Sequence, residues 1–144
     1  MIRDLSFPKV LRLKSTKQIG LLFESPRSVL CYPLLVKFRI ENGLSSVQRP
    51  MVAFSVPKRT FKSAVVRNRI RRRMKECYRL NWKEKFDSEF LQNSGELTMI
   101  LIYVAKEEKK YNLIQEGMLK LLDRLKNEIL KSSGKENSAD KEEA

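Results

Sequence analysis

The chain concentrates its basic side chains in one window that contains no acidic residue. Between Asn42 and Lys75 there are ten Lys and Arg and no Asp or Glu, whereas the other 110 residues carry 20 basic and 17 acidic side chains. The densest part is RNRIRRRMKE, residues 67–76, with five Arg and one Lys. An Arg guanidinium presents a planar fork of donors that matches phosphate oxygens, and it can also stack on a base. These residue types at this density predict binding to a polyanion such as nucleic acid.

The residues exclude most kinds of catalytic chemistry. The chain has no His, which removes His-based acid–base catalysis and most zinc sites. Metal-dependent nucleases use clustered Asp and Glu, and the basic window has none. Cys31 and Cys77 have no ligand spacing and are expected to be buried thiols. We therefore expect no catalytic residue, no metal site and no cofactor on this chain.

Composition limits the class of protein. With 144 residues, 42% of them hydrophobic and 33% charged, the chain predicts one folded domain. Its net charge of +13 indicates an anionic partner, either nucleic acid or an anionic membrane. The longest apolar run, MILIYVA at residues 99–105, is too short to span a bilayer, and MIRDLSFPKV does not resemble a signal peptide. A cytoplasmic protein without a membrane partner is the expectation.

The pattern of apolar residues predicts an α+β sandwich of one sheet and three helices. Pro33 is expected to split a β-rich segment into a short and a longer strand, and the strand that follows is expected to form a hairpin with the preceding one. Residues 132–144 have no apolar residue except Ala, and they predict a disordered tail after a single domain at 1–131. The expected elements are helix 15–24, two strands within 29–40, strand 51–56, helix 63–85, strand 97–105 and helix 111–130.

Most of the basic residues lie on one predicted helix, 63–85. Its apolar residues recur at spacings of four, four and three and predict a stripe that faces the sheet: Val66, Ile70, Met74 and Cys77. Like charges at i,i+4 on the opposite arc repel each other, and cations are unfavourable near a helix N-terminus. Such an arrangement fits a nucleic-acid backbone better than a solvated surface. The expected RNA-binding residues are Lys58, Arg59, Lys62, Arg67, Asn68, Arg69, Arg71, Arg72 and Lys75, of which Asn68 could equally serve a structural hydrogen bond.

The segment FSVPKRTFKSAVVRNRIRRRMKE, residues 54–76, resembles the signature of the bacterial ribonuclease P protein component. The signature is a strand, a basic pair, a small-residue turn, then Arg-Asn-Arg, an apolar residue and two more cations. In this chain those positions are Lys58 and Arg59, Ala64 and Val65, Arg67-Asn68-Arg69, Ile70, and Arg71-Arg72. The order of elements is similar over about residues 11–131.

The resemblance implies an accessory subunit of an endoribonuclease. In that family one small basic protein binds one large catalytic RNA and helps it to remove the 5′ leader of precursor tRNA. The RNA carries the chemistry and binds Mg²⁺, and the protein holds no cofactor. The fold implied is that of the second domain of ribosomal protein S5, with a mixed four-stranded sheet and a left-handed βαβ crossover.

The resemblance also implies a cleft between the first helix and the sheet that takes the leader as a single strand. The family tends to have two aromatic residues one turn apart in that helix. This chain has Phe23 at the second position and Ile19 at the first. Tyr32 and Phe38, on the predicted strands, are further candidates for stacking on leader bases, and each of the three could equally belong to the core.

Two other classes of protein stay open on the residues. A ribosome-associated structural RNA-binding protein would share the charge and the lack of an active site. A DNA-binding module could place the basic helix in a major groove. The Arg-Asn-Arg signature favours the ribonuclease P protein over both.

Overall fold

The computed structural model of the chain describes residues 16–41, 50–87, 90–91 and 96–143. Residues 1–15 and 144, for which the sequence predicts part of the domain and the end of the tail, lie outside the described residues. The described elements are, in chain order, α1 (Thr16–Phe23), β1 (Ser28–Cys31), β2 (Leu34–Glu41), β3 (Met51–Ser55), α2 (Ala64–Lys85), β4 (Glu96–Tyr103) and α4 (Tyr111–Glu143). The α+β prediction is confirmed, because four strands form one mixed sheet that is covered by helices.

The strands pair in the order β1-β2-β4-β3. β4 pairs antiparallel with β2, from Leu34↔Tyr103 to Glu41↔Glu96, and parallel with β3. The prediction of a hairpin between β3 and the preceding strand is therefore wrong. β4 lies between them because its sequence, ELTMILIY, is apolar at most positions, and a strand that is buried on both faces belongs in the interior of a sheet. The left-handedness of the crossover from β3 through α2 to β4 stays a prediction.

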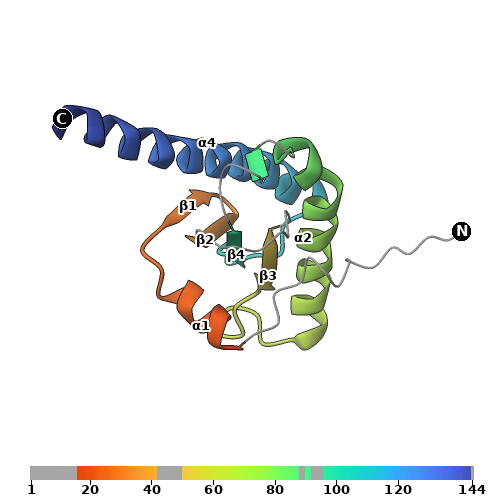
Figure 1. Cartoon of the computed structure of the whole chain (residues 1–144). Coiled ribbons are helices and arrows are strands. Elements are labelled where there is room, and N and C mark those ends of the chain that lie inside the picture. Colours follow the sequence, from red (N-terminus) through yellow and green to blue (C-terminus); the bar gives the residue numbers. More distant parts are fainter. Residues whose placement is uncertain (1–15, 42–49, 88–89, 92–95, 144) are drawn as a thin grey trace, which may run out of the picture.

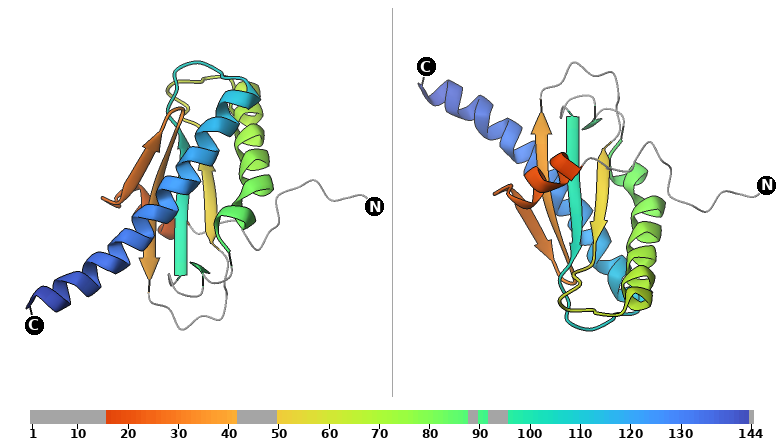
Figure 2. Two further views of the ribbon diagram at one scale, coloured as in Figure 1. Left: turned by 90° about the horizontal axis from the view of Figure 1, so that it is seen from above. Right: turned by 90° about the horizontal axis from the view of Figure 1, so that it is seen from below.

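The sheet separates two apolar clusters of unequal size. α2 and α4 cover one face, and α1 lies on the other (Figure 1). The large cluster joins α2 and α4 to the strands and includes Phe38, Leu101 and Met118. The small cluster joins Leu22 of α1 to Ile100 of β4. α1 is eight residues long, so it covers the second face only in part, as the right-hand view of Figure 2 shows.

α2 begins and packs where the sequence predicts. Its N-cap is Ser63, whose Oγ accepts a hydrogen bond from the main-chain N–H of Val66 over 3.3 Å. The predicted stripe faces the core, because Ile70, Met74 and Cys77 are fully buried. No acidic residue lies in the first turn of α2, so the cations of this helix are placed at its positive end without a local counter-charge.

α4 is longer than the sequence predicts. The expected helix ends at Leu130 and is followed by a disordered tail, whereas the backbone of α4 is helical through Glu143. Once a helix exists, each added residue gains one hydrogen bond, so α4 can continue past its apolar stripe although Ser, Gly, Asn and Asp among residues 132–140 are weak helix formers. That the tail is disordered stays a prediction. The first half of α4 crosses the sheet and packs against α2, β1 and β2 (Figure 2).

Candidate nucleic-acid interface

The nine predicted RNA-binding residues form one accessible surface, here called the basic surface. They belong to the loop after β3 and to the first twelve residues of α2, and they are Lys58, Arg59, Lys62, Arg67, Asn68, Arg69, Arg71, Arg72 and Lys75. None of them is buried, whereas Ile70 and Met74, which lie among them in the sequence, are fully buried. The tertiary structure thus keeps the cations together at the surface of one rigid helix and its preceding loop.

Arg67 is part of the architecture of this surface. Its Nη1 donates to the main-chain oxygen of Phe61 over 2.7 Å and to that of Lys62 over 3.0 Å. Both acceptors belong to the loop that carries Lys58, Arg59 and Lys62. Arg67 therefore fixes the loop against the helix, in addition to any contact that it makes with an anion.

Asn68 serves the structural role that the sequence leaves open. Its Oδ1 accepts a hydrogen bond from Nη1 of Arg71 over 2.7 Å, and its main-chain oxygen lies 3.5 Å from Nε of Arg72. Because the amide oxygen orients Arg71, Asn68 helps to fix the direction in which a neighbouring guanidinium points.

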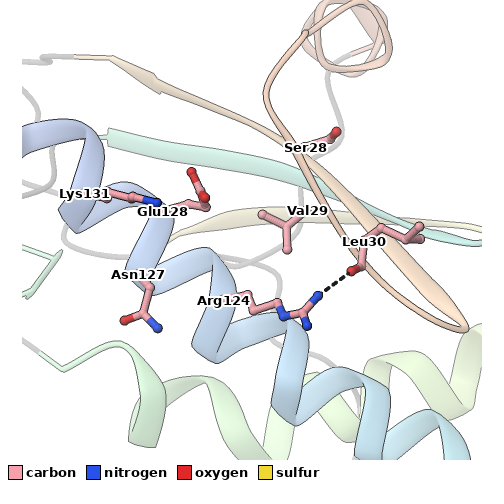
Figure 3. Close-up of a pocket in the computed structure, with 7 residues that line it drawn as sticks. All are labelled: Ser28, Val29, Leu30, Arg124, Asn127, Glu128 and Lys131. Carbon is pink, nitrogen blue, oxygen red and sulfur yellow. Dashed lines mark hydrogen bonds between the residues drawn. The ribbon is translucent and has the colours of Figure 1, made fainter. Parts of the chain in front are cut away.

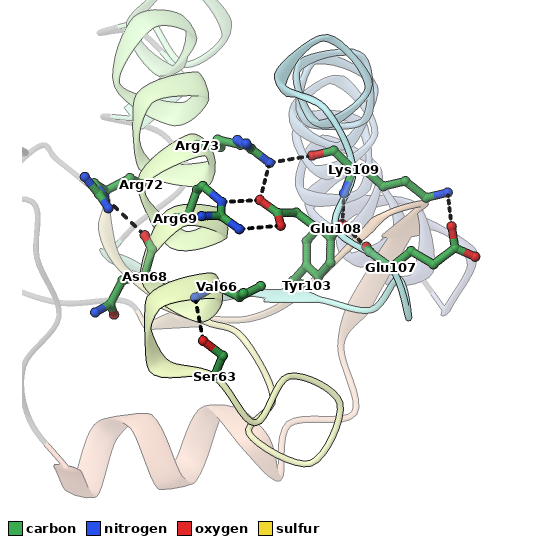
Figure 4. Close-up of polar contacts among 10 residues, drawn as sticks. All are labelled: Ser63, Val66, Asn68, Arg69, Arg72, Arg73, Tyr103, Glu107, Glu108 and Lys109. Atoms are coloured by element: carbon green, nitrogen blue, oxygen red, sulfur yellow. Dashed lines mark hydrogen bonds and ion pairs between the residues drawn. The ribbon is translucent and has the colours of Figure 1, made fainter.

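A carboxylate from a distant loop joins the basic surface. Nε and Nη2 of Arg69 donate to the two oxygens of Glu108, over 2.5 and 2.8 Å, and Nη1 of Arg73 lies 2.9 Å from Oε2 (Figure 4). The hydrogen bond from Arg69 is the main reason that the pKa of Glu108 is lowered from its usual value. Sequence reasoning missed Glu108 because no local spacing relates it to residues on α2.

Arg69 and Arg73 also line a hollow of about 390 Å³ between α2 and the start of α4, together with Arg72, Glu76 and Tyr111. Glu76 is paired with Arg79, one turn further along α2, through an Oε1–Nη2 distance of 2.5 Å. Three guanidinium groups around one open space, next to an aromatic ring, can hold a phosphate group.

The structure separates the three candidate leader-binding aromatics. Phe23, at the end of α1, is 44% exposed, and Tyr32, in the turn between β1 and β2, is 58% exposed. Phe38 is 2% exposed and packs in the large core cluster, on the sheet face opposite α1. A base cannot stack on a ring that the core covers, so Phe38 is removed from the candidates. The reason is register: Phe38 falls on the same face as Leu34 and Val36.

Tyr32 does not share a surface with Phe23. Nζ of Lys37 donates to the main-chain oxygen of Phe23 over 2.8 Å, and Lys37 pairs with Ser28 at the start of β1. Tyr32 follows the other end of β1, about 13 Å of strand away. Its ring instead lies 5.9 Å from Nζ of Lys109, in the loop before α4. The leader-binding prediction for Tyr32 therefore has no support from its position.

Two cations that sequence reasoning missed lie on the α1 face. Lys37 and Arg39 alternate with the buried residues of β2, so their side chains point toward the face that α1 covers only in part. The signal was present in the sequence, because KFR within LLVKFRIE places two cations two residues apart in a strand, and therefore on one face. Together with Phe23, Lys37 and Arg39 place two cations on the same face as one aromatic ring. Proteins that bind single-stranded nucleic acid use this combination.

A second hollow, also of about 390 Å³, lies between β1 and α4 (Figure 3). In it Nη1 of Arg124 donates to the main-chain oxygen of Leu30 over 3.2 Å. β1 is the last strand on its side of the sheet, so this bond occupies an outward-facing carbonyl of the edge strand. Glu128 and Lys131 give the remaining lining both signs of charge, which does not favour an anionic ligand.

The part of the chain that the structure describes offers neither a metal-binding cluster nor a membrane-spanning helix. There, no three His, Cys, Asp or Glu side chains gather closely enough to hold a metal ion. Every helix described is too short or too polar to cross a membrane.

The fold and the basic surface together define a nucleic-acid-binding protein of the α+β class. The chain belongs to the Ribonuclease P family, whose model matches residues 7–126. Membership gives it a role in tRNA processing as a protein component of an endoribonuclease complex. The predicted resemblance is thereby confirmed.

Relatives of known name agree with the family. The proteins called Ribonuclease P protein component in two strains of Porphyromonas gingivalis are 28% identical over 122 residues, which cover 85% of this chain and 88% of theirs. Among solved structures, the RNase P protein of Staphylococcus aureus superposes with a TM-score of 0.63 at 19% identity, covering 81% of this chain and 96% of that one. The RNase P protein from Thermotoga maritima gives 0.60 at 21% identity, covering 78% and 96%. Both structures are similar to this chain in fold.

Proposed function

We propose that the chain binds the catalytic RNA of ribonuclease P through the basic surface and assists the removal of the 5′ leader from precursor tRNA. The observation that carries the proposal is the basic surface itself: nine accessible polar groups on one rigid helix and its loop, in a member of this family. Guanidinium groups on a fixed scaffold match the regular spacing of phosphates and bind them with little loss of conformational entropy. One protein per RNA is the expected composition, and the cytoplasm is the expected location.

The 5′ leader is assigned to the other face of the sheet. Phe23 would stack on a leader base, while Lys37 and Arg39 would neutralise phosphates beside it. The main-chain bond from Lys37 to Phe23 ties the end of α1 to β2, which keeps the aromatic ring and the cations together. Support for this assignment comes from the exposure of Phe23 and from the short α1, which leaves part of the sheet accessible.

The chemistry is assigned to the RNA, with Mg²⁺ bound there. A divalent cation polarises a phosphoryl oxygen and lowers the pKa of a bound water. The described residues of this chain do not fit that role, because they offer no cluster of three ligands and the basic surface repels cations. The part of this chain is to bind and orient.

The proposal is tested with purified components. Protein alone should not cleave precursor tRNA, whereas protein with its cognate RNA and Mg²⁺ should cleave at the mature 5′ end. RNA recovered with the tagged protein from cells should be dominated by one species of a few hundred nucleotides. Cleavage by protein free of RNA would contradict the proposal. Recovery of ribosomal RNA instead would favour the alternative, a ribosome-associated structural protein.

A further inference from the structure

Glu108 holds Arg69 by one edge of its guanidinium group. The two hydrogen bonds use Nε and Nη2, the side-on geometry that fixes the plane of the group. Within the described part of the chain, no hydrogen bond or ion pair uses Nη1 of Arg69. The edge formed by Nη1 and Nη2 can therefore still donate to a phosphate in the adjacent hollow.

The loop that carries Glu108 is itself fixed by a buried tyrosine. The hydroxyl of Tyr103 donates to the main-chain oxygen of Glu107 over 2.6 Å and accepts from the main-chain N–H of Lys109 over 2.9 Å. Tyr103 is fully buried, so these bonds hold both neighbours of Glu108 against the core (Figure 4). A third hydrogen bond holds the loop, because Nη1 of Arg73 donates to the main-chain oxygen of Lys109 over 2.9 Å.

Two effects of opposite sign follow for RNA binding. A carboxylate beside the basic surface repels phosphates and competes for guanidinium donors, which lowers affinity. The same carboxylate immobilises a long side chain before binding, which removes an entropy cost from the complex. A carboxylate that RNA displaces would sit on a loose loop, whereas this loop is bonded on both sides of Glu108. The rigidity of this loop therefore favours the second effect, in which Glu108 orders the side chain of Arg69 before RNA binds.

We propose that Glu108 is a positioning residue that prepares Arg69 for a phosphate of the RNA. The inference rests on the proposed function and deepens it, because it adds a residue outside the basic window to the RNA-binding machinery. Glu108 contacts no RNA in this arrangement and acts through Arg69, with Arg73 in support.

The test uses two matched variants of the full chain, Glu108→Gln and Glu107→Gln. Each removes one negative charge from the same loop, but Glu107 is 81% exposed and pairs only loosely with Lys109, at 3.5 Å. Binding to the RNA subunit of ribonuclease P is measured at one fixed salt concentration. Glu108→Gln should bind about three- to tenfold more weakly than the wild type, the effect of one side chain that must be ordered on binding. Glu107→Gln should bind equally or more tightly, because it loses only repulsion.

A double-mutant cycle separates positioning from a general structural role. In an Arg69→Ala background, Glu108→Gln should change RNA affinity by less than about twofold, because the group that it acts on is gone. Thermal melting of each variant checks that the fold is kept. As a measurement without RNA, the NMR signal of the Arg69 Nε–H should be protected from exchange in the wild type and lose protection in Glu108→Gln.

The outcomes distinguish the two proposals. Equal or tighter binding by Glu108→Gln, or the same loss in both backgrounds, would overturn the positioning role and leave the proposed function standing. Failure of the wild type to bind the RNA subunit would overturn the proposed function, and the positioning role with it. Unprotected Arg69 Nε–H in the wild type would overturn the positioning role whatever the binding results.

Discussion

The guanidinium of Arg67 lies 2.7 Å from the main-chain oxygen of Phe61, so the first arginine of the Arg-Asn-Arg run is bonded to the loop that precedes its own helix. Arg72 differs from it. Arg72 is exposed, and its Nε is 3.5 Å from the main-chain oxygen of Asn68, which is too long for a strong hydrogen bond. The basic surface therefore contains arginines that support the structure and arginines that project from it.

The contrast predicts different phenotypes for two Arg→Ala substitutions. Both Arg67→Ala and Arg72→Ala should weaken binding to the catalytic RNA by about 1.5–3 kcal/mol, the range for a hydrogen bond to a charged group. Arg67→Ala should also lower the melting temperature by a few degrees, because it releases two main-chain acceptors, whereas Arg72→Ala should not. Calorimetry and RNA binding assays measure the two effects. Equal melting temperatures for the two variants would contradict the structural role of Arg67.

Phe23 and Tyr32 allow a matched test of the leader surface, since both aromatic rings are exposed but lie at opposite ends of β1. Phe23→Ala should leave assembly with the catalytic RNA intact and weaken binding of precursor relative to mature tRNA by about 1–3 kcal/mol, the value of one base stack. Tyr32→Ala should leave that preference unchanged. Circular dichroism checks that each variant is folded. A folded Phe23→Ala protein with the wild-type preference would refute the assignment.

Gly117 and Gly20 predict opposite effects of the same substitution on stability. A Cβ at Gly117 would lie 2.8 Å from Cδ of Pro33 and 3.0 Å from the main-chain oxygen of Tyr32, whereas at Gly20 no atom lies within 4 Å. Gly117→Ala should destabilise the protein by about 1–3 kcal/mol, because α4 must move off the β1–β2 turn. Gly20→Ala should stabilise α1 by up to about 1 kcal/mol, through helix propensity. Urea unfolding measures both, and a neutral Gly117→Ala would show that α4 shifts without cost.

The lowered pKa of Glu108 predicts how its contribution to stability depends on pH. The folded state binds the proton less tightly than the unfolded state, whose pKa is the usual 4.5. The stabilisation is therefore present above pH 4.5 and is lost as the pH falls through the lower folded value. Wild type should melt at a higher temperature than Glu108→Gln at neutral pH, and the difference should shrink as the pH falls below 4.5. A difference that stays constant over this range would show that the ion pairs of Glu108 do not stabilise the fold.

Sequence reasoning succeeded where the decisive interactions are local. The start of α2 at Ser63 and the burial of Ile70, Met74 and Cys77 follow from a capping residue and a period of 3.6, both of which act within a few residues. The length and basic character of the same helix were predictable for the same reason. The family signature lies in one continuous segment, so it too could be read without a structure.

Predictions failed where a choice depended on segments far apart in the chain. The hairpin of β3 with β2 was wrong because β4, more than forty residues later in the chain than β3, competes for the same strand edge and buries more apolar surface there. Phe38 was assigned to a binding cleft because its strand was known but its face was not. A shift of one residue in register exchanges the two faces of a strand.

By itself, the sequence determined that this protein has a basic helix whose first turns carry no acidic residue, because helix periodicity and charge are properties of neighbouring residues. Only the tertiary structure decided what each cation does. It brought Glu108 to Arg69 across 39 residues, bonded Arg67 to its own loop and left Arg72 exposed. It also decided that Lys37 and Arg39 share a face with Phe23, while Tyr32 lies beyond the other end of β1. The physical reason is common to all of these: a side chain's partner is set by which elements pack together, and packing is a property of the whole chain.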